Sequence, residues 1–211
     1  MTAFKICGLS TPETVDAALA VGAFALGFVF FPPSPRHLTL DQARALVARV
    51  PQGVARVAVT VDADDALIDA ILATGIDTLQ LHGHESPARV ADVAARTGRP
   101  VWLARGVRTA SDIRAAIADA APASRLLLDA KAPEGAALPG GNGLSFDWRL
   151  LHDTRPPLPW GLGGGLDPDS VRTALASVRP HFVDVSSGVE DAPGKKSIAK
   201  IRAFAAAVQA S

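Results

Sequence analysis

Residues 160–190, WGLGGGLDPDSVRTALASVRPHFVDVSSGVE, contain the pattern that decides the fold. A short, mainly apolar run at 160–162 leads into a glycine-rich turn, and a second such run follows at 182–185. The stretch between them is amphipathic, and it begins at Asp167 and Pro168, a carboxylate followed by a proline, as helices commonly do. Short apolar strands joined by helices are typical of a parallel sheet whose strands are buried on both faces.

The same unit recurs along the rest of the chain. Strands are predicted at 4–7, 25–30, 54–61, 78–82, 101–104, 125–129, 160–162 and 182–185. Their starts are mostly about 20–30 residues apart, the length of one strand, one helix and two loops. The expected helix starts are Ser10 or Thr11, Thr39, Thr109 or Ser111, Asp167 and Ser197, with plainer helical patterns at 64–73 and 86–97. Residues 131–144 are rich in proline and glycine, so we expect a long loop there rather than a domain linker.

Eight strand–helix units in 211 residues predict an α/β protein, a single (β/α)8 TIM barrel domain over residues 1–211. The alternative is a doubly wound open sheet, which needs only about five or six strands and carries a glycine-rich nucleotide fingerprint after the first one. Residues 7–10 (CGLS) have no such loop, and 161–166 (GLGGGL) departs from G-x-G-x-x-G at the last position. The pattern therefore favours the barrel.

Composition limits the partners and the location of the protein. Lys and Arg total 21 and Asp and Glu total 21, and this zero net charge argues against nucleic acid or an anionic membrane as the main partner. The single cysteine excludes an internal disulfide and fits a reducing, cytoplasmic location. Residues 1–8 lack the apolar core of a signal peptide, and no uncharged apolar stretch reaches the roughly 18 residues of a membrane span.

A barrel of this kind places its chemistry at the carboxyl ends of the strands. Read in order, these ends carry Cys7, Phe30, Asp62, Gln80, His82, Arg105, Asp129, the glycines 163–165 and Asp184. The loops after the seventh and eighth strands contain Gly164, Gly165, Ser186, Ser187 and Gly188. Either loop alone reads as an ordinary turn, but both lie where such barrels bind phosphate. We expect their backbone N–H groups, with the helix start at 167–168, to hold a phosphate.

Several motifs occur in one order along the chain. They are 5–9 (KICGL), 31–36 (FPPSPR), 79–83 (LQLHG), 126–129 (LLLD), 140–143 (GGNG), 146–148 (FDW), 164–166 (GGL), 183–190 (VDVSSGVE) and 193–194 (PG). With these motifs the sequence resembles the phosphoribosylanthranilate isomerase family from residue 5 to about 205. It departs from the family at Asn142, where threonine is usual, at Gly163, often alanine, and at Ser197, usually acidic, which remains a good helix cap.

The resemblance implies an Amadori rearrangement in tryptophan biosynthesis, from N-(5-phosphoribosyl)anthranilate to 1-(2-carboxyphenylamino)-1-deoxyribulose 5-phosphate, with no cofactor. It implies Cys7 as the general base, which requires a site that favours the thiolate. It also implies Asp129 as the general acid, whose protonated form needs burial or a neighbouring carboxylate such as Asp184. Arg36 is expected to pair with the anthranilate carboxylate through its planar fork.

Other polar residues have two interpretations each. Gln80 and His82 alternate with leucines and should face the interior of the barrel as substrate-binding residues, although His82 fits equally as a core histidine. Lys5 either assists Cys7 or forms a buried salt bridge. His82 and His84 are spaced like metal ligands, but no third ligand is evident and no metal site is expected.

The expected partner is therefore the small-molecule substrate, phosphoribosylanthranilate, bound by a monomer or a homodimer. Two other functions fit parts of the pattern. Another sugar-phosphate isomerase or epimerase barrel would share the phosphate loops but not the combination of Cys7, Asp129 and Arg36. A non-catalytic barrel that binds a phosphate ligand would need neither Cys7 nor Asp129.

Overall fold

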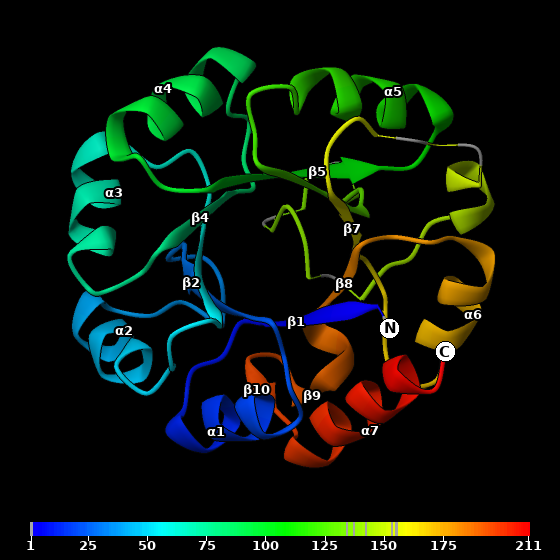
Figure 1. Cartoon of the computed structure of the whole chain (residues 1–211), viewed down its shortest axis with the longest axis horizontal. Helices are drawn as coiled ribbons and strands as arrows, with labels where there is room; N and C mark the ends of the chain where they lie inside the picture. Colours follow the sequence, from blue (N-terminus) through cyan, green and yellow to red (C-terminus); the bar gives the residue numbers. More distant parts are fainter. Residues whose placement is uncertain (1, 134, 137, 142, 153, 155) are drawn as a thin grey trace.

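Eight parallel strands close into a barrel in their order along the chain, and β8 is hydrogen-bonded to β1. The structure, a computed structural model, describes residues 2–133, 135–136, 138–141, 143–152, 154 and 156–211. Figure 1 shows the helices arranged around the outside of the strands, with both chain ends on the same side of the barrel. The (β/α)8 barrel predicted from the strand spacing is confirmed.

The bounds of the elements follow the predicted ones closely. The barrel strands are β1 (Ala3–Cys7), β2 (Ala25–Phe30), β3 (Ala55–Thr60), β4 (Thr78–Leu81), β5 (Val101–Val107), β6 (Arg125–Ala130), β7 (Trp160–Leu162) and β8 (Phe182–Val185). The α-helices are α1 (Pro12–Ala20), α2 (Leu40–Val47), α3 (Asp65–Leu72), α4 (Pro87–Thr97), α5 (Ala110–Asp119), α6 (Val171–Ser177) and α7 (Ile198–Gln209).

Three features differ from the expected eight strand–helix units. Between β6 and β7 the described residues form no α-helix, only the 3-10 helix η1 (Trp148–Leu151) after the expected long loop. After β8, the 3-10 helix η2 (Ser187–Val189) leads into an antiparallel hairpin of β9 (Glu190–Ala192) and β10 (Lys195–Lys196) that the sequence pattern did not indicate.

The third difference is the start of α6, which lies at Val171 rather than at Asp167 and Pro168. The Asp167 carboxylate accepts hydrogen bonds from the N–H groups of Asp169 and Ser170, so it closes a turn in front of the helix instead of capping it.

The helix caps are mostly those expected from the sequence. Thr11, Thr39 and Thr109 each accept a hydrogen bond from the backbone N–H three residues further on, as an N-cap does. Asp64 and Ser86 do the same for the two helices whose sequence patterns are plainer. Ser197 precedes α7 but makes no capping bond, so its expected role as a cap is wrong. None of the helices built by the described residues has the length and apolar content needed to traverse a bilayer.

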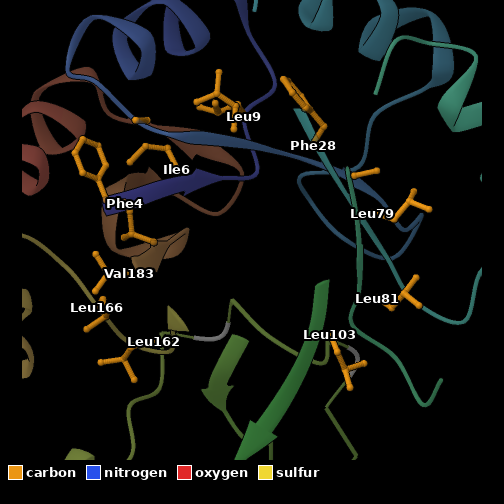
Figure 2. Close-up of a cluster of buried hydrophobic side chains, with 14 of the residues drawn as sticks. Phe4, Ile6, Leu9, Phe28, Leu79, Leu81, Leu103, Leu162, Leu166 and Val183 are labelled. Atoms are coloured by element: carbon orange, nitrogen blue, oxygen red, sulfur yellow. The ribbon is translucent and has the colours of Figure 1, made fainter. Parts of the chain in front are cut away.

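Alternate residues of each strand face outward and form the main apolar layer. This layer lies between the strands and the helices, and Figure 2 shows Phe4 and Ile6 of β1, Leu79 and Leu81 of β4, and Leu103 of β5 among its members. All of these side chains are at most 4% exposed. The residues between them therefore point into the barrel, which places Lys5, Cys7 and Gln80 in its interior.

The barrel interior is apolar at its amino-terminal end. Trp102 and Phe182 pack there with ring centroids 5.2 Å apart, and Phe24 stacks on Trp102 at 5.9 Å. The Arg125 guanidinium lies 5.5 Å from the Trp102 ring, a cation–π arrangement that covers this end. Since the aromatic rings fill this end, the polar interior residues are left at the carboxyl end.

Gly161 on β7 is where this packing is tightest. A Cβ atom at this position would overlap the Phe182 ring, whereas a Cβ at Gly163 would meet its nearest neighbour at 3.4 Å, an ordinary contact. Gly161→Ala is therefore expected to lower the free energy of unfolding by about 1–3 kcal/mol through overpacking. Gly163→Ala is the control and should unfold at nearly the same urea concentration as the unmodified chain. Equal midpoints for the two variants would contradict this account of the interior.

Candidate active site

A pocket opens at the carboxyl ends of the strands, where the sequence placed the chemistry. It brings together the expected catalytic and substrate-binding residues Cys7, Arg36, Gln80, His82, Asp129 and Asp184, and Ser186 of the expected phosphate loops also lines it. Val29, Phe31 and Val59 form an apolar part of its wall, and residues 138–141 of the loop after β6 form another part. The pocket therefore combines a thiol, carboxyl groups, an imidazole and a guanidinium beside an apolar wall.

An ion pair lies in the interior below the pocket. The register of β1 on β8 places Lys5 beside Asp184, and the Lys5 Nζ lies 2.9 Å from an Asp184 carboxylate oxygen. Lys5 is completely buried. Burial alone would lower the pKa of Lys5, but the negative charges of Asp184 and Cys7 raise it overall, so the ammonium form persists. Lys5 is thus a buried salt-bridge partner, one of the two roles open to it from the sequence.

Cys7 ends β1 at the bottom of the pocket and is 7% exposed. The absence of a side chain at Gly27 makes room for it, since a Cβ there would lie 2.8 Å from the sulfur. Burial raises the pKa of the Cys7 thiol above its ordinary value, and the neighbouring Lys5 charge only partly offsets this. Burial therefore opposes the thiolate that a general base at this position requires, and the Lys5 charge supports it.

Asp129 ends β6 and is 8% exposed. Burial, together with the nearby negative charge of Asp184, raises the pKa of Asp129 to about 7. One of its carboxyl oxygens accepts a hydrogen bond of 2.8 Å from the N–H of Ala130. This is the environment that a carboxylic acid needs if it is to hold a proton near neutral pH.

Two polar atoms in the pocket wall have no hydrogen-bond partner among the described residues, the His82 Nε2 and the Gln80 Oε1. The His82 Nε2 lies 3.5 Å from an Asp129 carboxyl oxygen. Burial, with the Lys5 charge, lowers the pKa of His82 to about 4, so its ring is neutral at physiological pH. Buried polar atoms are usually paired, so an atom left open in a pocket is a natural contact for a ligand.

Arg36 lies at the side of the pocket and is 5% exposed. Its Nε and Nη2 donate to the two carboxylate oxygens of Glu190 at 2.7 and 2.8 Å. Glu190 also accepts from the Lys196 Nζ at 2.5 Å. Burial opposes ionisation of Glu190, but these two cations outweigh it and hold the pKa of Glu190 below its usual value.

A second, polar cavity adjoins the pocket between the loops that follow β7 and β8. Gly164, Gly165, Ser186 and Ser187 line it, together with Gly141 and Gly143 from the loop after β6. Gly164 and Gly165 have φ of +82° and +64°, a left-handed backbone that favours glycine. Gly188 packs so closely on the Leu166 carbonyl that a side chain would not fit, so it joins the two loops rather than lining the cavity. Because α6 starts only at Val171, the expected helix N-terminus does not directly follow Gly165.

Some expected residues lie outside these cavities. Asp62 accepts a hydrogen bond from the His84 N–H at 2.6 Å, so His84 pairs there and not with His82. Arg105 donates to the Glu85 carbonyl at 2.5 Å. Among the described residues no group of His, Cys, Asp and Glu side chains is placed to hold a metal ion. Asn142 lies outside the described residues.

The sequence matches the family model described as N-(5'phosphoribosyl)anthranilate (PRA) isomerase over residues 4–207. The N-(5'-phosphoribosyl)anthranilate isomerase of Cereibacter sphaeroides is 53% identical over 95% of both chains. That of Azorhizobium caulinodans is 54% identical over 98% of this chain and 91% of the relative. The chain belongs to the phosphoribosylanthranilate isomerase family.

Solved structures of the family have the same fold. The phosphoribosyl anthranilate isomerase of Thermotoga maritima has a TM-score of 0.90 and 35% identity, with both chains covered completely. A phosphoribosyl anthranilate isomerase in complex with reduced 1-(o-carboxyphenylamino)-1-deoxyribulose 5-phosphate has a TM-score of 0.87 and 33% identity over the full length of both chains. A further structure is of mutually generated monomers of the dimeric Thermotoga maritima isomerase.

Two residues of this family member's site were not singled out from the sequence, Glu190 and Lys196. Glu190 was visible only as the last residue of the motif at 183–190, and nothing in the sequence connects it with Arg36, 154 positions earlier. Their pairing follows from the hairpin of β9 and β10, which lies against the loop that carries Arg36.

The raised pKa of Asp129 has a consequence for stability. Between the ordinary value of 3.8 and about 7 the folded chain keeps a proton that the unfolded chain has lost, so the free energy of unfolding falls as pH rises. The loss is at most about 1.4 kcal/mol per pH unit. Asp129→Asn removes this titration, so its melting temperature relative to the unmodified chain should increase from about pH 5 to about pH 8. Asp147→Asn, at an exposed carboxylate of lowered pKa, is the control and should show no such trend. If the melting temperatures of Asp129→Asn and of the unmodified chain changed with pH in parallel, the raised pKa of Asp129 would be contradicted.

Proposed function

We propose that Asp129 and Cys7 are the acid and the base with which this isomerase converts N-(5'-phosphoribosyl)anthranilate to 1-(2-carboxyphenylamino)-1-deoxyribulose 5-phosphate in tryptophan biosynthesis. The observation that carries the proposal is that a carboxyl group with a pKa of about 7 and a buried thiol line one pocket, from β6 and β1. An acid with that pKa can give up and recover a proton near neutral pH.

In the first step the Asp129 carboxyl group gives its proton to the ring oxygen of the ribose. The bond between this oxygen and C1′ breaks, and the lone pair of the substrate nitrogen forms a C=N bond to C1′. In the second step the Cys7 thiolate removes the proton at C2′, and the electron pair moves through C1′ to the nitrogen, giving an enolamine. Transfer of the enol proton to C1′ then produces the ketone. The substrate nitrogen accepts the electrons, so the chain needs to supply only the acid and the base.

The productive state is therefore a protonated Asp129 with an ionised Cys7. The ligand-free site favours the first of these and, through burial, opposes the second. The positive charge of Lys5 lowers the pKa of Cys7 most, with a further contribution from Lys196, so these two ammonium groups stabilise the thiolate. This arrangement assigns Lys5 an electrostatic role in addition to its salt bridge with Asp184.

We assign the remaining recognition to two anion sites at opposite ends of the substrate. The cavity lined by Gly164, Gly165, Ser186 and Ser187, with Gly188 joining its two loops, is suited to the phosphate, since glycine allows backbone N–H groups to approach the oxygens. Arg36, at the side of the neighbouring pocket, is suited to the anthranilate carboxylate. Gln80 and His82 offer unpaired polar atoms to the sugar between these ends.

Arg36 also distinguishes this function from the two alternatives. A general sugar-phosphate isomerase needs one anion site, whereas this pocket has a guanidinium beside an apolar wall as well as the glycine-lined cavity. A barrel that only binds phosphate needs no carboxyl group of raised pKa. All the groups named here come from one chain, and an unpaired Cys7 fits the cytoplasmic location that the proposal includes.

The acid and base assignments are tested by Asp129→Asn and Cys7→Ser. Each should lower kcat by about 10²-fold or more, because each removes one proton transfer while keeping nearly the same shape. The fluorescence of the substrate, generated in place, reports turnover, and calorimetry with the reduced product analogue should show that binding is retained. Asp62→Asn, at a strand-end carboxylate outside the pocket, is the control and should turn over normally. Near-normal kcat in either pocket variant would contradict that assignment.

The carboxylate site is tested by Arg36→Met, which keeps the apolar stem and removes the fork. Loss of a charged hydrogen bond of about 1.5–3 kcal/mol corresponds to roughly 10–150-fold in affinity. KM for phosphoribosylanthranilate should rise accordingly, with a smaller change in kcat. Competitive inhibition by inorganic phosphate, which has no carboxylate, should be unchanged. If substrate and phosphate weakened equally, Arg36 would be a phosphate ligand instead.

A further inference from the structure

The hairpin of β9 and β10 is docked on the loop that carries Arg36. Its turn residue Gly194 has φ of +78°, and a Cβ at this position would lie 2.5 Å from the Pro35 carbonyl oxygen. The Gly194 N–H also donates to the Glu190 carboxylate at 3.2 Å. The hairpin therefore fixes Glu190 directly beside Arg36.

The Glu190 carboxylate is saturated with donors from this neighbourhood. It accepts from the Nε and Nη2 of Arg36, from the Nζ of Lys196 and from the Gly194 N–H. Its side chain is 4% exposed and does not line the pocket. Any effect of Glu190 on a ligand must therefore pass through Arg36 or Lys196.

The donors of Arg36 are divided between Glu190 and the pocket. Nε–H and one Nη2–H point to Glu190, and Nη2 also lies 3.4 Å from the Gly141 carbonyl oxygen. Nη1 has no hydrogen bond to any described residue and lies beside Gly141, which forms part of the pocket wall. The stem of Arg36 packs on Gly8, where a Cβ would lie only 2.5 Å from the Cδ. Contacts with Glu190, Gly141 and Gly8 therefore hold the Arg36 side chain, and Nη1 is the nitrogen left to contact a ligand.

We propose that Glu190 is a positioning residue for substrate recognition, which fixes the Arg36 fork so that its Nη1 faces the substrate carboxylate. This inference rests on the proposed role of Arg36 and adds the group that sets its orientation. A planar fork held in advance loses less entropy when it binds a second carboxylate.

Lys196 explains how a guanidinium already paired with a carboxylate still attracts an anion. Arg36 with Glu190 alone would be neutral, but Lys196 shares the same carboxylate; burial and Arg36 lower the pKa of Lys196, Glu190 opposes this, and with Lys196 as the ammonium the cluster carries a net charge of +1. The substrate carboxylate would bring it to neutrality. Lys196 also donates to the Ser186 carbonyl at 3.0 Å, so the cluster is tied to a loop of the proposed phosphate cavity.

The test uses two substitutions of Glu190, one that shortens the side chain and one that removes its negative charge. Glu190→Asp keeps the charge but withdraws the acceptor by one methylene, and Glu190→Gln keeps the length but replaces one acceptor oxygen with an NH₂ group. Both should raise KM for phosphoribosylanthranilate by about tenfold while kcat changes much less. Inhibition by inorganic phosphate should be unchanged. An unchanged or lowered KM in a folded Glu190→Asp would overturn the proposal, because Glu190 would then only neutralise the cations.

A double-mutant cycle shows whether Glu190 acts through Arg36. In an Arg36→Met background, Glu190→Asp should cause no further rise in KM, whereas an additive rise would overturn the proposal. If Arg36→Met alone leaves KM unchanged, the proposed carboxylate role of Arg36 is wrong. If Arg36→Met raises KM but Glu190→Asp leaves it normal, only the positioning role of Glu190 is wrong.

A matched control separates positioning from general destabilisation. Asp77 forms a similar pair with Arg56, at 2.8 Å, outside the pocket. Asp77→Asn should lower the melting temperature without raising KM. If Glu190→Gln does not fold, Glu190→Asp and the cycle still decide the question, since Glu190→Asp keeps the negative charge between Arg36 and Lys196.

Discussion

The chemistry of the site depends on one buried ion pair, Lys5 with Asp184. Each member acts on both Asp129 and Cys7: the charge of Asp184 raises the two pKa values, and the charge of Lys5 lowers them. Loss of either member would leave a buried charge uncompensated and would shift both pKa values. Because the pair exists only through the register of β1 on β8, closure of the barrel and the acid–base chemistry depend on the same strand pairing.

The space available for side chains inside the barrel decides where the ion pair and the pocket lie. Aromatic rings fill the amino-terminal end of the interior, and position 161 is a glycine because the Phe182 ring occupies the space that a side chain would need. Gly27, which pairs with Cys7 on the neighbouring strand nearer the carboxyl end, has no side chain and so makes room for the Cys7 sulfur. Polar groups at the carboxyl end remain partly unpaired, as the His82 Nε2 and the Gln80 Oε1 show. The outward apolar layer beneath the helices offsets this local cost, since most of the buried apolar side chains belong to it.

Local signals in the sequence were sufficient for the strands, for most of the caps and for the strand-end residues of the pocket, whereas Arg36 was indicated only by the resemblance to the family. They failed where an effect depends on tertiary structure. Asp167 and Pro168 look like a helix start, but the carboxylate closes a turn instead. The two-residue strand β10 is too short to have a periodicity, so the hairpin and its contact with Pro35 were invisible. The rise in the pKa of Cys7 could not be predicted either, because the burial that causes it is set by the closed barrel and not by neighbours in the chain.

The charges of the substrate act on the two proposed catalytic groups in opposite directions. Asp129 and Asp184 both border the cavity suited to the phosphate, so a bound phosphate would add negative charge beside Asp129 and favour its protonated form further. The same charge would disfavour a thiolate at Cys7. Binding of the phosphate would therefore favour the protonated acid and oppose the ionised base, and the charges of Lys5 and Lys196 act against this second effect by lowering the pKa of Cys7. The buried Lys5 ammonium is thus the nearest counter-charge for a thiolate that both burial and the phosphate would disfavour, and its pairing with Asp184 keeps that charge in the interior.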